Sequence, residues 1–299
     1  MALLIFSFAE KKTKMQDITF LLSELTTNIY RAQQMTPGIS GFETGFAGFD
    51  TLTSGLQKSE LILLSGPSGI GLTPFALSII RNKIKQDPSV GIVYFSTLLS
   101  EMQILTMLVC GEIDIDISTL KSGQFNSEKQ KLLDSFIEKC KKSNIYIDDT
   151  PNQSFDEILS KIEDIRDSYR IDCIIIDSLE EFCNDKISIE DGLKALKDIA
   201  KITCLPVIVL LETNVLKVMN ASLDLMDISP QVKRYKQVDM HCLLHRHEYY
   251  QITEDESGQS VLGDAELFIL QNEGNTGSVK FKFEYSFYRF REKSQEQTL

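Results

Sequence analysis

Two hydrophobic patterns alternate along most of this chain. Short apolar runs predict buried strands, and stretches in which an apolar residue recurs every three or four positions predict amphipathic helices. Helical patterns lie between many of the strands, for instance at 156–169 and 189–202. This alternation predicts an α/β fold with a mainly parallel central sheet flanked by helices. The predicted strands cover residues 61–64, 91–96, 144–147, 172–176, 207–211, 241–244, 266–270 and 279–283.

The last two predicted strands follow each other without a helix between them. Residues 272–277 read Asn-Glu-Gly-Asn-Thr-Gly, which is a turn sequence. Consecutive strands that are joined by a short turn pair in the antiparallel direction. We therefore expect the parallel sheet to end in a C-terminal antiparallel hairpin.

A separate helix is predicted over residues 16–34, ahead of the first strand. An apolar stripe on an otherwise polar helix has to pack against something, which is either its own domain or another chain. Pro37 and Gly38 end the helical pattern. The stripe consists of Ile18, Leu21, Leu22, Leu25, Ile29 and Tyr30.

These patterns divide the chain into unequal parts. We predict an N-terminal extension at 1–15, a linker-type helix at 16–37, one domain at 38–292 and a polar tail at 293–299. Met15 is an alternative to Met1 as the first residue. The 299 residues suffice for one large α/β domain with a short appendage.

The charge balance limits the choice of partners. The chain has 31 basic and 43 acidic residues, which gives a net charge of −12. A protein this acidic does not bind nucleic acid through its bulk charge. A local basic patch at Lys233, Arg234 and Lys236 is either a DNA contact or a solvated turn.

Cysteine usage and hydropathy indicate the compartment. The six cysteines form no C-x-x-C pair, and several lie in apolar runs, so we expect buried thiols in a reducing compartment. The apolar run at residues 2–6 is too short to span a bilayer and lacks the features of a signal peptide. We therefore expect a cytoplasmic protein without a membrane segment.

A glycine-rich stretch, Ser-Gly-Pro-Ser-Gly-Ile-Gly-Leu-Thr at residues 65–73, follows the first predicted strand and precedes a helix. This context is typical of a phosphate-binding loop with the pattern G-x-x-x-x-G-K-[ST]. Gly66, Gly71 and Thr73 are in register, whereas Leu72 holds the lysine position. Loop amides and the threonine hydroxyl can still cradle phosphate and Mg²⁺, but Leu72 cannot neutralise phosphates. The loop is therefore either a structural turn or a phosphate site without its charge.

Segments along the chain resemble, in order, the C-terminal RecA-like motor domain of DnaB-type replicative DNA helicases. The similarity covers residues 35–292 and implies a RecA-like P-loop NTPase fold. RecA, circadian-clock and DNA-repair ATPases share the loop, but the segments at 146–150 and 248–250 favour the replicative helicases. The segments that carry the resemblance are 38–46, 52–57, 93–96, 121–124, 144–150, 193–196 and 246–250.

The resemblance implies a site in which most catalytic residues are replaced. The family's glutamate that activates water falls on Leu98, its polar sensor on Glu212, and its lysine and arginine that reach the neighbouring subunit's nucleotide on Leu270 and Asn272. Only Thr73 and Asp177 keep the magnesium-holding chemistry. The nucleotide-binding positions correspond to Gly66, Ser68, Gly69, Gly71, Leu72, Thr73 and Asp177.

These replacements predict a domain that does not hydrolyse ATP. An arginine finger contributes roughly 10³–10⁵ to the rate of such reactions, and general-base assistance about 10²–10⁴. We expect an interaction or regulatory protein in DNA replication, with ATP and Mg²⁺ bound without hydrolysis or with no cofactor. One alternative is an active ATP-dependent helicase with displaced residues, for which Lys58 is a conceivable substitute for the lysine. Another is a nucleotide-binding switch.

The resemblance also implies partners. The helix at 16–34 resembles the family's linker helix, which packs on a neighbouring subunit, so the expected partner is a second copy or a helicase-like subunit. In the family, loops that correspond to residues 215–238 hold single-stranded DNA. Acidic residues in this segment make us expect weak DNA binding. The basic residues there are Lys217, Lys233, Arg234 and Lys236.

Three further groups carry alternative interpretations. If residues 241–247 form a strand, His241, His245 and His247 share one face, and His245 and His247 could share a metal or face solvent or a neighbour. Glu180 and Glu181, near Asp177, are either metal ligands or a sign that the site has drifted from triphosphate binding. The pair at 148–149 favours a turn and helix cap over a catalytic dyad.

Overall fold

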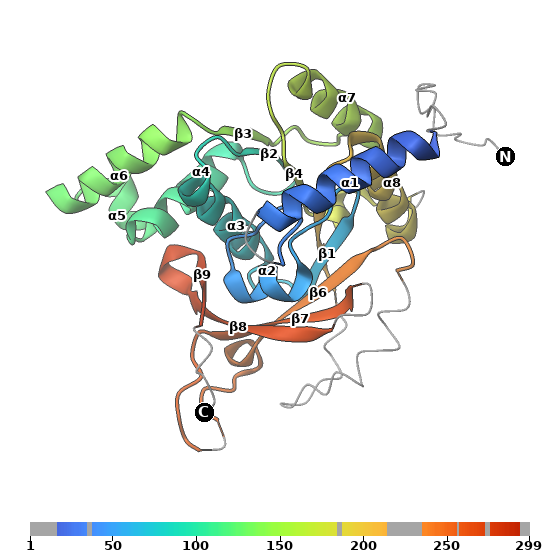
Figure 1. Ribbon diagram of the computed structural model, residues 1–299. Coiled ribbons are helices and arrows are strands. Elements are labelled where there is room, and N and C mark those ends of the chain that lie inside the picture. Colours follow the sequence, from blue (N-terminus) through green and yellow to red (C-terminus); the bar gives the residue numbers. More distant parts are fainter. Residues whose placement is uncertain are drawn as a thin grey trace.

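The computed structural model describes residues 17–34, 38–183, 187–213, 235–255, 257–272 and 276–293. Within these residues, a nine-stranded sheet runs through the centre of the molecule, with helices on both faces (Figure 1). The strand order is β3-β2-β4-β5-β1-β6-β7-β8-β9. The strands are β1 Leu61–Gly66, β2 Gly91–Ser96, β3 Asn144–Asp148, β4 Cys173–Asp177, β5 Val207–Glu212, β6 Met240–Arg246, β7 Asp264–Asn272, β8 Gly277–Glu284 and β9 Arg289–Glu292.

The predicted sheet is confirmed. The strands from β3 to β6 in this order pair in parallel, and β6 to β9 pair in the antiparallel direction. The predicted hairpin is β7 and β8, in which Leu267 lies opposite Val279. Strand β9 was not predicted, because its sequence, Arg-Phe-Arg-Glu, contains no apolar run.

Alternate residues of the strands make two cores, one on each face of the sheet. Ile62 and Leu64 of β1 pack with residues of α2, α3, α4 and α6. Leu61 and Leu63 of the same strand pack with residues of α7 and α8. The α-helices are α1 Ile18–Gln34, α2 Ala47–Thr53, α3 Leu72–Gln86, α4 Glu101–Ile113, α5 Ile117–Ser122, α6 Ser127–Cys140, α7 Phe155–Arg166 and α8 Ile189–Thr203.

Helix α1 forms where the periodicity predicts it. Every α1 side chain for which burial is described is exposed, including Ile18, Leu22, Leu25 and Ile29 of the apolar stripe. These four residues are therefore not covered by the described part of their own chain. The predicted extension at 1–15 and most of the tail lie outside the described residues.

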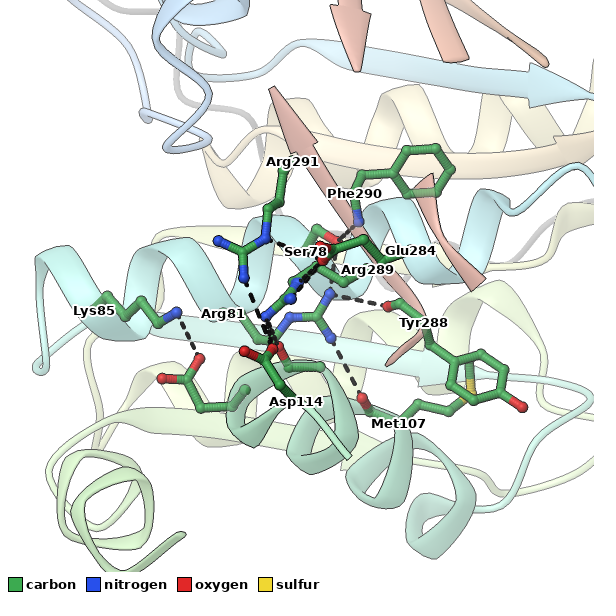
Figure 2. A network of polar contacts seen from close by, with 12 residues as sticks. Ser78, Arg81, Lys85, Met107, Asp114, Glu284, Tyr288, Arg289, Phe290 and Arg291 are labelled. Atoms are coloured by element: carbon green, nitrogen blue, oxygen red, sulfur yellow. Dashed lines mark hydrogen bonds and ion pairs between the residues drawn. The ribbon is translucent and has the colours of Figure 1, made fainter. Parts of the chain in front are cut away.

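A buried arginine ties α3 to the end of the sheet (Figure 2). Arg81 is only 1% exposed and donates hydrogen bonds to Ser78 Oγ at 2.7 Å and to the backbone carbonyl of Tyr288 at 3.0 Å. Burial, reinforced by the charge of nearby Arg289, lowers the pKa of Arg81 to about 9. Ser78 Oγ also accepts a hydrogen bond from the backbone N–H of Phe290. This network fixes β9 beside the helix that follows the glycine-rich loop.

None of the described helices is long and apolar enough to cross a membrane. All six cysteines are free, as their scattered positions predict.

Candidate functional site

The glycine-rich loop connects the carboxyl end of β1 to the first turn of α3. Strand order places β4, β5 and β1 side by side, so their carboxyl ends meet at this loop. In open parallel sheets this edge is where ligands bind. Gly71 has a φ of 110° and precedes the first helical residue, a conformation that favours glycine.

Two of the predicted site residues meet directly. Thr73 Oγ1 donates a 2.7 Å hydrogen bond to Asp177 Oδ2. The hydroxyl of Tyr94, on β2, donates to the same oxygen. Burial raises the pKa of Asp177, while these two hydrogen bonds oppose the rise. A hydroxyl and a carboxylate at the end of a phosphate loop are suitable ligands for Mg²⁺.

Leu72, which holds the lysine position of the loop, is an apolar residue and packs against other apolar residues. Leu72 is 7% exposed and belongs to the core on the α3 face, together with Ile70, which is fully buried. A Cβ on Gly66 would lie 2.8 Å from Ile70 Cγ2 and 3.5 Å from Leu72 Cδ2. The side chains of Ile70 and Leu72 therefore pack against the first glycine of the loop. A lysine at position 72 would instead direct its ammonium group towards bound phosphates.

A buried arginine supports the loop. Arg246, at the end of β6, donates a 2.9 Å hydrogen bond from Nη1 to the carbonyl oxygen of Ile70. Its guanidinium lies over the ring of Phe283, 4.2 Å from the centroid, and its Nη2 forms an ion pair with Glu248. The phenyl ring of Phe290 lies under the loop, since a Cβ on Gly71 would be 3.1 Å from its Cζ.

Acidic groups gather at the ends of β4 and β5. Glu180 lies in the short 3-10 helix Leu179–Phe182 that follows β4, and one of its oxygens accepts a hydrogen bond from the backbone N–H of Glu212. Burial raises the pKa of Glu180, and the charge of Glu212 raises the pKa values of both Glu180 and Asp177 further. The sheet register places Glu212 opposite Gly66. Glu212 therefore disfavours the charged forms of two other carboxylates beside the loop.

The structure describes the three other residues that are predicted to replace catalytic groups, Leu98, Leu270 and Asn272. Leu98 is 65% exposed in the connection between β2 and α4, so no carboxylate lies where the family's glutamate would be. Asn272 is buried opposite Met240, at the amino end of β6 and away from the loop of its own chain. Leu270 is partly exposed on β7.

Lys58, the suggested substitute for the lysine, and Lys236, a predicted DNA contact, both lie away from the loop. Lys58 precedes β1, and six strand residues separate it from the loop, which corresponds to roughly 20 Å. Lys58 is therefore not a substitute for the missing lysine. Lys236 is exposed ahead of β6, also at the amino end of the parallel strands. The other predicted DNA contacts, Lys217, Lys233 and Arg234, lie outside the described residues.

The histidines do not form a metal site. His241 Nε2 lies 2.7 Å from Ser65 Oγ, and His245 stacks on Tyr250 with ring centroids 5.3 Å apart. His247 leaves the strand and starts a 3-10 helix, although its ring contacts that of His245. Among the described residues, no group of three or more His, Cys, Asp or Glu side chains could hold a metal ion.

The acidic pair at 148–149 has structural partners. Asp149 Oδ2 accepts a 3.0 Å hydrogen bond from the first backbone N–H of α4, that of Glu101. Asp148 accepts from the backbone of Thr150 and forms an ion pair with Lys161. The predicted turn and helix cap are confirmed.

Sequence reasoning missed Tyr94, Arg246 and Phe290 as parts of this site. Tyr94 stands in a fully buried strand, where only its hydroxyl distinguishes it from the other apolar residues. Arg246 ends β6, which lies beside β1 and parallel to it, whereas Phe290 comes from β9 on the antiparallel side of the sheet. The one signal in the sequence was an arginine at the end of an apolar strand, since a charged side chain there needs a partner.

The model of the family described as "DnaB-like helicase C terminal domain" matches residues 41–292. The chain belongs to this family. The "Replicative DNA helicase DnaC" of Bacillus subtilis is 27% identical over 299 residues, which cover 96% of this chain and 64% of that protein. The "Probable replicative DNA helicase" of Trieres chinensis is 29% identical over 265 residues, which cover 85% of this chain and 58% of that protein. The chain thus spans about three fifths of the length of these curated relatives.

Solved structures share the fold. One solved ATPase domain superposes with a TM-score of 0.74 at 22% identity, covering 90% of this chain and 97% of that one. A DnaB-like replicative helicase, solved in a study of its interactions with primase, gives a TM-score of 0.73 at 23% identity, covering 92% and 66%. The RecA-like P-loop fold, inferred from the sequence, is confirmed.

Proposed function

We propose that this protein is a DnaB-type motor domain that does not hydrolyse ATP and acts as an interaction or regulatory protein in DNA replication. The observation that carries the proposal is the position of Leu72, buried against Gly66 and Ile70 where the family has a lysine. Without that charge, nothing at this position neutralises the β- and γ-phosphates. The strands and the helix that frame the loop, β1, β5, β6 and α3, are nevertheless present.

Three further losses support the same conclusion. Leu98 offers no carboxylate to activate water, and Leu270 and Asn272 offer no cation to a neighbouring site. Each missing group contributes orders of magnitude to the rate in enzymes of this class. Effects of residues that act together are not additive, but their joint loss leaves no group to provide the chemistry.

Helix α1 is the proposed contact with a partner. Ile18, Leu22, Leu25 and Ile29 are exposed and spaced by four, three and four residues, which is the a/d spacing of a helix that packs on another helix. We propose that this stripe docks on a second copy of the chain or on a helicase-like subunit. Burial of four large apolar side chains is a sufficient driving force, at about 1.5–3 kcal/mol for each fully buried residue.

The outer face of α4 is the proposed receptor. Met102 and Leu105 are exposed on this helix, and Leu98 is exposed just ahead of it. Met102 and Leu105 are three positions apart and share one face of α4, whereas Leu98 lies in the connection ahead of the helix, which begins at Glu101. An exposed apolar ridge on a protein of this charge indicates a protein contact. Its position next to the lost catalytic glutamate suggests that the former reaction site has become a contact surface.

Binding of single-stranded DNA is proposed to be weak. The described basic candidate, Lys236, lies exposed at the amino end of the parallel strands. The net charge of −12 opposes long-range attraction to phosphates.

We propose that the protein is located in the cytoplasm, which agrees with its free thiols.

The test is steady-state phosphate release from ATP by the purified chain, with Mg²⁺ and with or without single-stranded DNA. We expect a rate equal to that of buffer. An ATPase rate that disappears on Asp177→Ala would reject the proposal, because the activity would then depend on the magnesium carboxylate.

A second candidate, a nucleotide-binding switch without hydrolysis, is favoured by one contact. The pair of Thr73 and Asp177 keeps the arrangement that holds Mg²⁺. A switch requires ATP or ADP to bind with measurable affinity and without turnover, so a binding assay separates it from the first candidate.

A further inference from the structure

We infer that the loop at residues 66–73 excludes magnesium–nucleoside triphosphates altogether, because carboxylates and hydrocarbon surround it where a polyanion needs cations. The inference deepens the proposed loss of hydrolysis, on which it rests, by removing the binding step as well. If the loop excludes nucleotides, the protein is not the nucleotide-binding switch that is the second candidate above.

The charge at the carboxyl edge of the sheet is the first argument. The charge of Glu212 acts on both Asp177 and Glu180, and one oxygen of Glu180 is buried without a hydrogen-bond partner among the described residues. Glu212 also lies opposite the first glycine of the loop. A triphosphate at the loop would bring several further negative charges against groups that already repel one another. Against this repulsion stand the Mg²⁺ that accompanies the triphosphate and the backbone N–H groups of the loop, without a lysine.

Arg246, the cation that contacts the loop in the part of the chain that the structure describes, does not supply the missing charge. Arg246 approaches the loop, but its Nη1 is used by the carbonyl oxygen of Ile70 and its Nη2 by Glu248. The positive charge of Arg246 is therefore balanced by the negative charge of Glu248. Within the described ranges, the ion pairs of the lysines and arginines go to other carboxylates than Asp177, Glu180 and Glu212.

The loop is also held in shape by the protein itself. Ile70 and Leu72 fill the space against Gly66, and Phe290 lies under Gly71. The backbone N–H of Thr213 donates a 2.8 Å hydrogen bond to the carbonyl oxygen of Gly66, which fixes the start of the loop to β5. These internal contacts hold the loop in place without a bound phosphate.

Substitutions at Leu72, Glu180 and Glu212 can restore the charge balance that ATP binding needs. Leu72→Lys restores the cation, and Glu180→Gln with Glu212→Gln removes two negative charges while keeping hydrogen-bonding groups. The combined variant still lacks a carboxylate at Leu98, so it is expected to bind ATP without hydrolysing it. The matched control is Leu72→Met with Glu181→Gln, because Glu181 is an exposed neighbour of Glu180.

The experiment is equilibrium dialysis of the full chain against labelled Mg²⁺–ATP near neutral pH. We expect no saturable binding to the wild type below about 1 mM, and none to the control variant. The combined variant is expected to bind at least about tenfold more tightly than that limit, since one attractive charge replaces two repulsive ones. Circular dichroism verifies that each variant is folded. If lysine at position 72 prevents folding, the variant with only the two glutamines is measured, and saturable binding at millimolar ATP is expected.

The outcomes are distinguishable. Saturable binding of ATP to the wild type below about 1 mM, without phosphate release, overturns this inference and leaves the proposed function intact. Binding with phosphate release overturns both. A folded combined variant that still binds no ATP also overturns the inference, because charge and Leu72 would then not be the cause of exclusion.

Discussion

The hydroxyl of Thr73 donates a 2.7 Å hydrogen bond to the carboxylate of Asp177 across the carboxyl edge of the sheet. This contact survives although Leu72, the preceding residue, has lost the chemistry of a phosphate loop. The pair is explained by structure, since Asp177 is buried and needs hydrogen-bond donors. The contact therefore has a structural role that does not depend on hydrolysis.

Removing the hydroxyl of Tyr94 should destabilise the fold. In Tyr94→Phe, the buried carboxylate of Asp177 loses one of its two side-chain donors and keeps Thr73. We expect the free energy of unfolding to fall by about 1–3 kcal/mol, the usual effect of losing a hydrogen bond to a charged group. Urea titration monitored by circular dichroism measures it. Stability equal to that of the wild type would show that this hydrogen bond contributes nothing.

Gly111 on α4 should resist substitution because of Arg81. A Cβ at position 111 would lie 2.3 Å from Arg81 Nη1 and 2.5 Å from its Cζ. Alanine normally favours a helix by about 1 kcal/mol over glycine, but here we expect Gly111→Ala to destabilise the protein by about 2–3 kcal/mol.

A double-mutant cycle assigns this effect to Arg81. In an Arg81→Met background, which removes the guanidinium, the penalty of Gly111→Ala should shrink by at least about 1 kcal/mol. Equal penalties in both backgrounds, measured by urea unfolding, would contradict the placement of Arg81 against Gly111.

His241 should make the fold sensitive to acid. Burial lowers its pKa to about 4, whereas an unfolded histidine has a pKa of about 6.5. Between these values the unfolded chain binds the proton and the folded chain does not, so stability is lost as the pH falls from 6.5 towards 4. At pH 5 the contribution of this histidine is about 2 kcal/mol of destabilisation relative to pH 7.

The variant His241→Asn tests this pH dependence. The loss of unfolding free energy between pH 7 and pH 5 should be about 2 kcal/mol smaller than in the wild type, whatever the absolute stability of the variant. Urea unfolding at the two pH values measures the difference. Parallel losses in the two proteins would show that His241 is protonated in the folded state as easily as in the unfolded one.

The apolar stripe of α1 should determine how tightly the protein associates with a partner, with little effect on the free energy of unfolding of its own chain. Leu22→Asp together with Leu25→Asp places two charges on an exposed apolar seam, so we expect the dissociation constant of the self-complex to rise at least about tenfold. The unfolding free energy should change by less than about 0.5 kcal/mol. Sedimentation velocity over a concentration series measures the association.

Thr26→Asp together with Thr27→Asp is the matched control for α1. These threonines are exposed on the same helix, and their hydroxyls donate only to α1 carbonyl groups. The control should associate like the wild type. A wild type that is monomeric at all concentrations, alone and mixed with a DnaB-type helicase, would remove α1 as a docking element.

Much of the fold could be predicted because most strands are continuous apolar runs bounded by turns. Strand β9 could not, since Arg289 and Arg291 flank a single apolar residue, Phe290, and the arginines are held by Glu284 and Asp114. The burial of Arg81 was equally out of reach. One of its acceptors lies 207 residues away, and such a contact has no local pattern.

The candidate site could be predicted in part for the same reason. The pairing of Thr73 with Asp177 follows from strand order, because the ends of neighbouring parallel strands meet. Arg246 also reaches the loop from a parallel strand, since β6 lies beside β1, but its position depends on the packing of Phe283 from the antiparallel side, which the sequence of the loop does not contain. Leu72 was identifiable as a loss, but only the structure places it against Gly66.

The central claim is that this motor domain no longer hydrolyses ATP, and the most direct test is a single-turnover assay. The protein is used in large excess over labelled Mg²⁺–ATP, with single-stranded DNA, and phosphate release is followed for hours so that even very slow turnover is detected. The account predicts release at the rate of buffer, identical for the wild type and Asp177→Ala. Release that increases with protein concentration and is abolished by Asp177→Ala would contradict it.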